Sequence, residues 1–263
     1  MKNIFILLST LLLFSCQKVI DIHPPTGETK VIIQGYLYTD STARVVISKS
    51  TDYLNNTPPP SLGTGVVTLS DNHGNTEILT WNAIKQQYES VTIKGVENDT
   101  YTLKVDFEGK TYTSVSMLPH LEPADSIKVL KETGGFEDGY FMKLYATVST
   151  NVDLYYLFKG YADDKFLNGP NDIYYADNKW LNGNLDGIDI GYQYEVGEVA
   201  KLELFSLTHE AFEFYDAASL QLNNDGGFFS TPPANVPSMF DNGAIGLFQC
   251  SDKQIMTTTV VEQ

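Results

Sequence analysis

Short runs of strand-forming residues, separated by turn residues at intervals of about 8–12, fill the chain from Val31 to Met117. The clearest run, residues 101–107 (YTLKVDF), alternates apolar and polar residues and is followed by Glu108-Gly109, which predicts a hairpin turn. This pattern is typical of an N-terminal β-sandwich, which we assign to residues 31–118. The predicted strands are 31–38, 44–50, 65–70, 76–81, 87–93, 101–107 and 110–116.

A second region begins at Pro119 and Pro123, beyond which the strand-like runs become longer and more aromatic. We predict that residues 119–263 form a β-rich C-terminal domain with one helix. Thr208 is a suitable N-cap and Glu210 falls in the first turn, so the helix is expected to begin there and to end near Leu222. The predicted strands are 125–133, 140–149, 153–161, 188–196, 201–207, 243–249 and 255–261.

The N-terminus has the features of an exported lipoprotein. Lys2 precedes an apolar run over residues 4–14, and the tetrapeptide Leu-Phe-Ser-Cys ends at Cys16. The run is shorter than the roughly 20 residues that a membrane-spanning helix needs. We therefore predict a signal peptide over residues 1–15, palmitate and other acyl chains on Cys16, and a lipidated tether over residues 16–30; the alternative is ordinary secretion with an incidental cysteine.

The charge of the chain limits its partners. Removal of residues 1–15 takes Lys2 from the 17 basic residues and nothing from the 33 acidic residues, so the net charge falls from −16 to −17. Such a chain is not expected to bind nucleic acid, and anionic lipids should repel its body, so the membrane partner must be reached through the lipid on Cys16. Lipidation also leaves Cys250 without a partner for an intramolecular disulfide.

Motifs for catalysis and metal binding are incomplete. His209 is followed by Glu210, but Glu213 stands where a zinc-protease helix has its second histidine. The segment Asn182–Asp186 resembles the start of a calcium loop, but Gln193 stands where such a loop has a bidentate glutamate, and a polar turn explains it better. We find no serine-hydrolase or nucleotide-binding motif and therefore predict no catalytic residue, no metal and no cofactor.

Aromatic residues supply the best binding candidates. The run 153–158 (DLYYLF) is apolar on both faces, which favours a strand buried on two sides over an exposed aromatic platform. The segment that follows contains Tyr174, Tyr175 and Trp180 and is expected to be a loop. Loops held by a rigid scaffold often carry recognition, so these three residues are our predicted ligand-binding side chains.

Several short motifs, in their order and spacing, resemble one family over nearly the whole mature chain. They are CQKVID (16–21), VIIQGY (31–36), DLYYLF (153–158), TPPANV (231–236) and NGAIGLF (242–248). The chain is thereby similar to the Bacteroidota lipoproteins known as domain of unknown function 4249. The resemblance implies an envelope lipoprotein with an N-terminal immunoglobulin-like or carboxypeptidase-regulatory-like β-sandwich and a β-rich C-terminal part.

The resemblance also implies a partner and a cellular location. Members are often encoded beside TonB-dependent outer-membrane transporters, which implies an accessory role in capture or uptake, and the family has no agreed catalytic residues. Surface-exported lipoproteins of this phylum often carry an acidic cluster directly after the cysteine, whereas here Val19 and Ile20 precede Asp21. The outer membrane is thus the expected location, and the sequence does not distinguish its periplasmic face from its surface-exposed face.

These observations give three hypotheses. The first is a non-enzymatic outer-membrane lipoprotein that binds a nutrient or a transporter through its C-terminal part. The alternatives are an envelope glycan hydrolase and a structural or adhesive surface module. A cleft with two facing carboxylates about 5–10 Å apart would favour the hydrolase, and an aromatic surface would favour binding.

Overall fold

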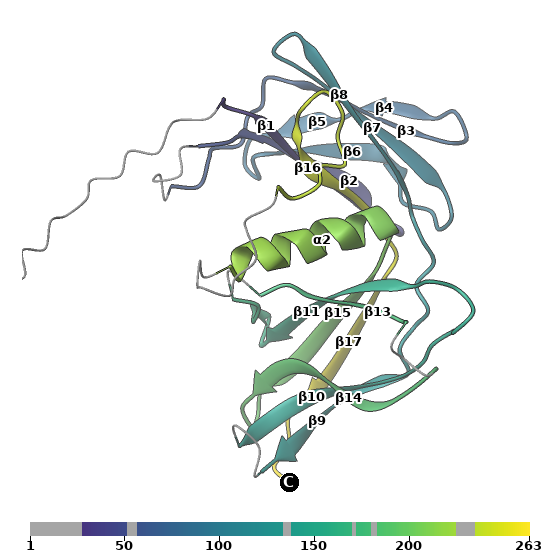
Figure 1. The fold of residues 1–263 in the computed structure, drawn as a ribbon, viewed down its shortest axis with the longest axis vertical. Coiled ribbons are helices and arrows are strands. Elements are labelled where there is room, and N and C mark those ends of the chain that lie inside the picture. The colour runs from purple at the N-terminus through teal and green to yellow at the C-terminus, as the bar shows by residue number, and fades with distance from the viewer. Residues whose placement is uncertain (1–27, 52–56, 134–137, 170–171, 180–182, 225–234) are drawn as a thin grey trace, which may run out of the picture.

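The protein is mostly β, with two β units stacked along the long axis and a single described helix, α2, between them (Figure 1). The computed structural model describes residues 28–51, 57–133, 138–169, 172–179, 183–224 and 235–263. The predicted fold class, mostly β with one helix, is confirmed. Cys16 and most of the expected tether lie outside the described residues.

The N-terminal unit is a sandwich of two sheets. The β1 sheet has the strand order β16-β1-β2-β6-β5, and the β7 sheet has the order β4-β3-β7-β8. Alternate residues of both sheets fill one core, in which Ile33, Ile47, Leu69 and Leu103 are fully buried. Besides β16, the strands of this unit are β1 (Val31–Tyr38), β2 (Thr42–Lys49), β3 (Val66–Asp71), β4 (Thr76–Ile78), β5 (Thr80–Asn82), β6 (Gln87–Lys94), β7 (Thr100–Phe107) and β8 (Lys110–Met117).

One predicted strand of this unit, 76–81, is divided between the two sheets. Its first part is β4, which pairs with β3, and its second part is β5, which pairs with β6. Leu79 lies between them with its side chain in the core, and its amide donates to the carbonyl of Val67 over 2.8 Å. The apolar alternation predicted extended backbone correctly but carried no signal for the change of sheet.

The strand β16 (Ile245–Ser251) departs from the predicted division of the chain. The sequence prediction places 243–249 among the strands of residues 119–263, but β16 is an edge strand of the N-terminal β1 sheet and runs parallel to β1. Phe248 and Cys250 enter the N-terminal core, and Gly246 packs so closely on β1 that a side chain there would collide with the carbonyl of Ile33. Parallel pairing between distant segments leaves no local sequence signal.

The C-terminal unit also contains two sheets. The β10 sheet has the order β14-β10-β9, and the β11 sheet has the order β12-β11-β15-β17, with β13 also pairing with β11. Between them lies a second core that includes Met142, Leu202 and Leu204. Its strands are β9 (Ser126–Glu132), β10 (Gly139–Thr147), β11 (Tyr155–Ala162), β12 (Lys165–Phe166), β13 (Tyr174–Asp177), β14 (Asn184–Tyr194), β15 (Val199–Leu207) and β17 (Lys253–Thr259).

The expected two-sided burial of residues 155–158 is confirmed. Tyr156 and Phe158 point into the core between the two C-terminal sheets. Tyr155 and Leu157 point the other way, into a third apolar cluster that also contains Tyr38 of β1. The β11 strand therefore lies between two packed layers, one inside the C-terminal unit and one at the junction with the N-terminal unit.

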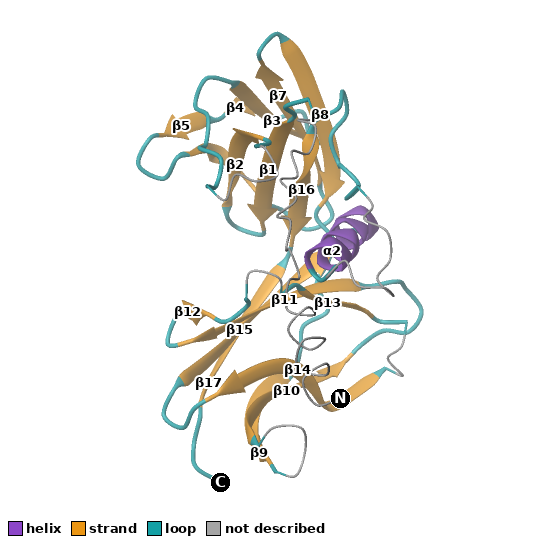
Figure 2. Ribbon diagram, turned by 60° about the vertical axis from the view of Figure 1, so that its left-hand side comes forward, coloured by secondary structure: helices purple, strands orange, loops and turns teal. Residues whose placement is uncertain are grey.

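The helix α2 (His209–Leu222) occupies that junction (Figure 2). Thr208 is its N-cap, as predicted, and accepts a hydrogen bond from the amide of Ala211 over 3.2 Å. Phe212 stacks near Tyr155 of β11, with ring centroids 4.8 Å apart, and the hydroxyl of Tyr215 donates to Gln249 of β16 over 2.7 Å. Within the described part of the chain, no helix combines the length and apolar character needed to span a membrane.

Candidate ligand-binding site

The C-terminal unit has a cleft between β13 and β14. These strands are neighbours along the chain, but β13 pairs with β11 and β14 pairs with β10, so their edges diverge. The resulting opening, which we call the β13–β14 cleft, has a volume of about 370 Å³. Its lining is apolar apart from the tyrosines and one carboxylate, and consists of Leu144, Phe158, Ile173, Tyr174, Tyr175, Ala176, Leu185, Ile188, Asp189, Ile190 and Gly191.

Two of the three predicted binding residues, Tyr174 and Tyr175, line this cleft. The expectation that they lie in a loop is wrong, because Tyr174–Asp177 form the strand β13. Successive side chains of a strand point to opposite faces, so Tyr174 packs into the C-terminal core and Tyr175 packs into the cluster beside α2. Trp180, the third predicted residue, lies outside the described residues.

Tyr174 forms an aromatic wall of the cleft. Its ring lies 4.8 Å from the ring of Tyr192 on β14. Gly191 makes room for it, because a Cβ atom at that position would lie 2.9 Å from Cε1 of Tyr174. Burial, assisted by the negative charge of Asp172, raises the pKa of the Tyr174 phenol, so the phenol is neutral at neutral pH and can both donate and accept a hydrogen bond.

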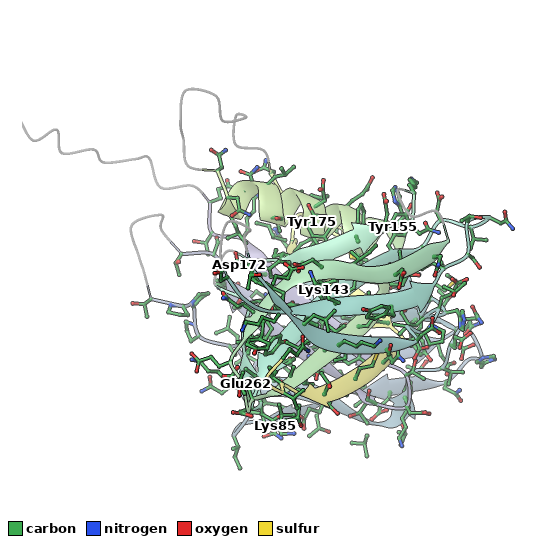
Figure 3. All side chains as sticks on the ribbon, turned by 90° about the horizontal axis from the view of Figure 1, so that it is seen from below. Lys85, Lys143, Tyr155, Asp172, Tyr175 and Glu262 are labelled. Atoms are coloured by element: carbon green, nitrogen blue, oxygen red, sulfur yellow. The ribbon has the colours of Figure 1, made fainter. Side chains whose placement is uncertain are left out.

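Tyr175 joins the other side of β13 to the helix. Its hydroxyl donates to Asp216 of α2 over 2.7 Å, and its ring lies 5.4 Å from that of Phe212 in an edge-on arrangement. Figure 3 shows Tyr155 and Tyr175 on the strands closest to α2. Burial first, and then Asp216, raises the pKa of Tyr175 to about 12. The residue therefore anchors the cleft wall and is less available to a ligand than Tyr174.

The carboxylate of the cleft already has a cationic partner. Asp189 Oδ2 lies 3.0 Å from Nζ of Lys143, a β10 residue whose ammonium also contacts Glu132 Oε1 at 2.5 Å. Burial lowers the pKa of Lys143, but the two carboxylates raise it more, so the lysine stays charged. Asp189 also accepts from the amide of Gly191 over 2.7 Å. Lys143 is shared by two carboxylates, so the three groups together keep one negative charge, which disfavours an anionic ligand in the cleft.

A small apolar pocket adjoins the cleft. It has a volume of about 30 Å³ and shares Leu144, Phe158, Ala176 and Leu185 with the cleft. Tyr156 lines it, and the buried hydroxyl of that residue has no hydrogen-bond partner among the described residues. An unsatisfied buried hydroxyl costs about 1–3 kcal/mol, so this atom is a candidate hydrogen-bonding partner that no described residue satisfies.

Most of the lining could not be identified from sequence. Leu144, Phe158 and Ile188 come from three strands that the fold alone brings together. Their apolar character predicted only core positions. The density of aromatic residues near 174–180 identified Tyr174 and Tyr175 as candidates. It gave no indication of the residues from other strands that line the cleft with them.

The described polar residues of the partial zinc-protease motif and of the partial calcium loop do not line the β13–β14 cleft. His209 and Glu213 are exposed one turn apart on α2, with His209 Nε2 3.1 Å from Glu213 Oε1. Of the predicted calcium segment, Asn182 lies outside the described residues. Asn184 and Asp186 belong to β14 and pair with Thr147 and Tyr145 of β10, so their backbone is held in a sheet. The strand begins four residues before the predicted 188–196.

Three other side chains come close enough to share a metal ion. They are Glu97, His120 and Asp252, whose ligand atoms all lie within 4.8 Å of one another at the junction of the two units. His120 Nδ1 is 3.0 Å from Glu97 Oε1, which is an ordinary ion-pair contact when the histidine is protonated. Proximity alone does not distinguish a metal centre from such a pair, and sequence reasoning did not anticipate the grouping.

A family model described as Domain of unknown function (DUF4249) matches residues 17–255. This span contains strands of both β units, the helix α2 and all residues of the β13–β14 cleft. The chain belongs to the DUF4249 family. A comparison with curated proteins gives no match. The resemblance inferred from the short motifs is thereby confirmed, and DUF4249 membership by itself assigns no activity.

Proposed function

We propose that this DUF4249 protein is a cell-envelope lipoprotein without enzymatic activity that binds a small, largely apolar ligand in the β13–β14 cleft. The observation that carries the proposal is the lining of the cleft, which combines aliphatic side chains with Tyr174 and a single carboxylate, Asp189, that is paired with Lys143. Ligand sites are usually concave, mainly apolar and about 300–1,000 Å³ in volume, and the cleft, at about 370 Å³, falls in that range.

The chemistry of the lining also indicates the type of ligand. Apolar walls favour an aromatic or aliphatic body, and the unpartnered hydroxyl of Tyr156 beside the adjoining pocket favours one polar atom on the ligand. A net charge of −16 for the whole chain disfavours anionic ligands at this position. An uncharged molecule with one hydroxyl, carbonyl or ether oxygen fits these conditions.

Among the described residues that line this site, the alternative of a glycan hydrolase finds no facing pair of carboxylates. Asp189 lines the cleft and Glu122 lines the inner pocket, so they belong to different cavities. Glu122 Oε2 accepts from the amide of Ser149 over 2.6 Å, and Asp189 pairs with Lys143. Glycosidase carboxylates must face the same bond, so binding is the better proposal for the cleft. A structural or adhesive role remains the second alternative.

The proposed location and partner rest on the sequence and the family. The signal peptide and Cys16 favour attachment to the outer membrane through acyl chains, on the periplasmic or the surface face. What the resemblance implies for DUF4249 members favours a TonB-dependent transporter as the partner. In this scheme the lipoprotein holds the ligand near the mouth of the transporter and is not itself the pore.

Affinity purification of the tagged protein from native membranes, with its lipid intact, tests the partnership. The wild-type protein should recover a β-barrel transporter, and Cys16→Ala, which lacks the acylated thiol, should lose palmitate labelling and recover much less. Cys250→Ala is the matched control and should keep the label, because Cys250 is a buried core residue. Recovery of no transporter by the wild-type protein would contradict the accessory role.

A further inference from the structure

Three cations gather at the junction of the two β units, on the face of the β11 sheet opposite to its core with the β10 sheet. Arg44 of β2 is the only arginine of the chain. Its guanidinium carbon lies 5.0 Å from the ring centroid of Tyr36 and 5.4 Å from that of Tyr38. It also donates a long hydrogen bond, 3.3 Å, to the hydroxyl of Tyr38. The two rings hold the guanidinium in place while leaving it exposed to solvent.

The other two cations come from the C-terminal unit. The ring of Phe205 on β15 lies 5.0 Å from that of Tyr38, which joins the two units. Nζ of Lys159 on β11 lies 4.9 Å from the Phe205 centroid, and Nζ of Lys253 on β17 lies 5.5 Å from the Tyr38 centroid. Arg44, Lys159 and Lys253, which we call the junction cations, thus surround one pair of aromatic rings.

The junction cations form no ion pair with any described residue. Glu203 is the cross-strand neighbour of Lys159, but its Oε2 accepts from the hydroxyl of Tyr161 over 3.1 Å. Across the described ranges, no carboxylate oxygen lies within 4.0 Å of any junction cation, whereas ion pairs are present at Lys49, Lys85, Lys104, Lys143, Lys179 and Lys201. In a chain with 33 acidic residues, three neighbouring cations that form no direct ion pair are unexpected, even with Glu203 nearby.

The arrangement has an electrostatic cost. Like charges at short range repel, and the half-buried position of Lys159 weakens the screening by water. Burial, and next the charge of Arg44, lower the pKa of Lys159, and Glu203 opposes them only in part. A bound anion would offset this repulsion and would satisfy the outward N–H groups of the guanidinium.

From this geometry we infer that the junction cations form a binding site for a polyatomic oxyanion, such as a sulfate, phosphate or carboxylate group. The planar fork of Arg44 can hold two oxygens of one anion, and the two lysines add positive charge from the other unit. The ligand would therefore bridge the two β units. This site is separate from the β13–β14 cleft and does not depend on the function proposed for it.

Calorimetric titration of the full-length lipidated protein in a non-ionic detergent, with sodium sulfate at constant ionic strength, tests the inference. The wild-type protein should bind sulfate saturably, and Arg44→Gln and Lys159→Gln should each weaken binding by about tenfold or more, because each removes a charge-assisted hydrogen bond. Lys128→Gln is the control, since Lys128 lies 4.6 Å over the ring of Tyr145 on the remote β10 sheet and has no carboxylate within 4.0 Å among the described residues.

A parallel titration with sodium acetate distinguishes the chemistry of the anion. Stronger binding of sulfate assigns a tetrahedral oxyanion, and stronger binding of acetate assigns a carboxylate. If circular dichroism shows that Arg44→Gln does not fold, the titration is carried out with Arg44→Lys and Lys159→Gln instead. No saturable binding of either anion, or equal binding by the wild-type protein and Lys159→Gln, would overturn the inference.

Discussion

The hydroxyl of Tyr175 on β13 donates to Asp216 on α2, with the two oxygens 2.7 Å apart. The same helix reaches the N-terminal unit through Tyr215, whose hydroxyl donates to Gln249 of β16 over 2.7 Å. One helix thus connects a wall of the cleft to the edge strand of the other unit. A substitution that disturbs one of these contacts should therefore alter the packing of α2 against the other unit.

The substitution Tyr175→Phe tests the first of these bonds. It removes a hydrogen bond to a carboxylate and leaves the ring contact with Phe212 intact, so the free energy of unfolding should fall by about 1–2 kcal/mol. Urea unfolding measures the change. Tyr145→Phe is the control, because no hydrogen bond of the Tyr145 hydroxyl is found among the described residues, and its stability should stay within about 0.5 kcal/mol of the wild type.

The substitution Tyr156→Phe should change the free energy of unfolding in the opposite direction. The hydroxyl of Tyr156 is buried without a partner, so its removal relieves a desolvation cost, and the free energy of unfolding should rise by about 1 kcal/mol. The same urea experiment measures it. A loss of stability like that of Tyr175→Phe would mean that the hydroxyl is satisfied in solution and is not a free recognition point.

The protein should lose stability at alkaline pH. The pKa of Tyr38, Tyr161 and Tyr175 is raised from 10.0 to about 12, in each case first by burial and, for Tyr161 and Tyr175, also by the neighbouring Glu203 or Asp216. Folding therefore favours the neutral phenols, and their contribution is complete below pH 10 and is lost as the pH rises towards 12. Urea unfolding at a series of pH values measures this loss, with tyrosinate absorbance recorded in parallel. Ionisation of Tyr38, Tyr161 and Tyr175 near pH 10 in the folded protein would contradict the prediction.

The pairing of β16 with β1 predicts a strong effect of Gly246→Ala. A Cβ atom at this position would collide with the carbonyl of Ile33, so the strands must separate at a cost of about 3 kcal/mol or more. Gly197→Ala is the comparison, because Gly197 also has a positive φ, +96°, but has open space around it. It should cost only about 1–2 kcal/mol. Equal thermal stability of the two variants would argue against the observed position of β16.

Local features of the sequence predicted local structure well. Glu108-Gly109 forms the expected turn between β7 and β8, with φ of +49° and +76°. Thr208 caps α2 because its side-chain oxygen satisfies a free amide of the first turn. Residues 155–158 are buried on both faces, as their two-sided apolar pattern requires. Each of these outcomes depends on residues close together in the chain.

Features that depend on distant pairing could not be predicted. The return of β16 to the N-terminal unit requires a partner far away in sequence. The change of sheet at Leu79 and the short strand β13 depend on which of the nearby strands share a sheet, and local patterns do not encode that choice. The β13–β14 cleft has the same origin, because it exists only where two neighbouring strands pair with different sheets. Tyr174 and Tyr175 were found because of their aromatic density, while their opposite orientations follow from the strand.

The most direct test of ligand binding in the cleft uses an uncharged apolar probe, N-phenyl-1-naphthylamine, and the unlipidated chain of residues 17–263. Ile188, 40% exposed, lines the cleft, and Ile255, 50% exposed, lies on β17 outside it. The wild-type protein and Ile255→Glu should show the same saturable fluorescence increase, and Ile188→Glu should bind about tenfold more weakly, because it places a charge against the apolar ligand. Equal binding by all three proteins, or no saturable binding by the wild type, would contradict the proposed role of the cleft.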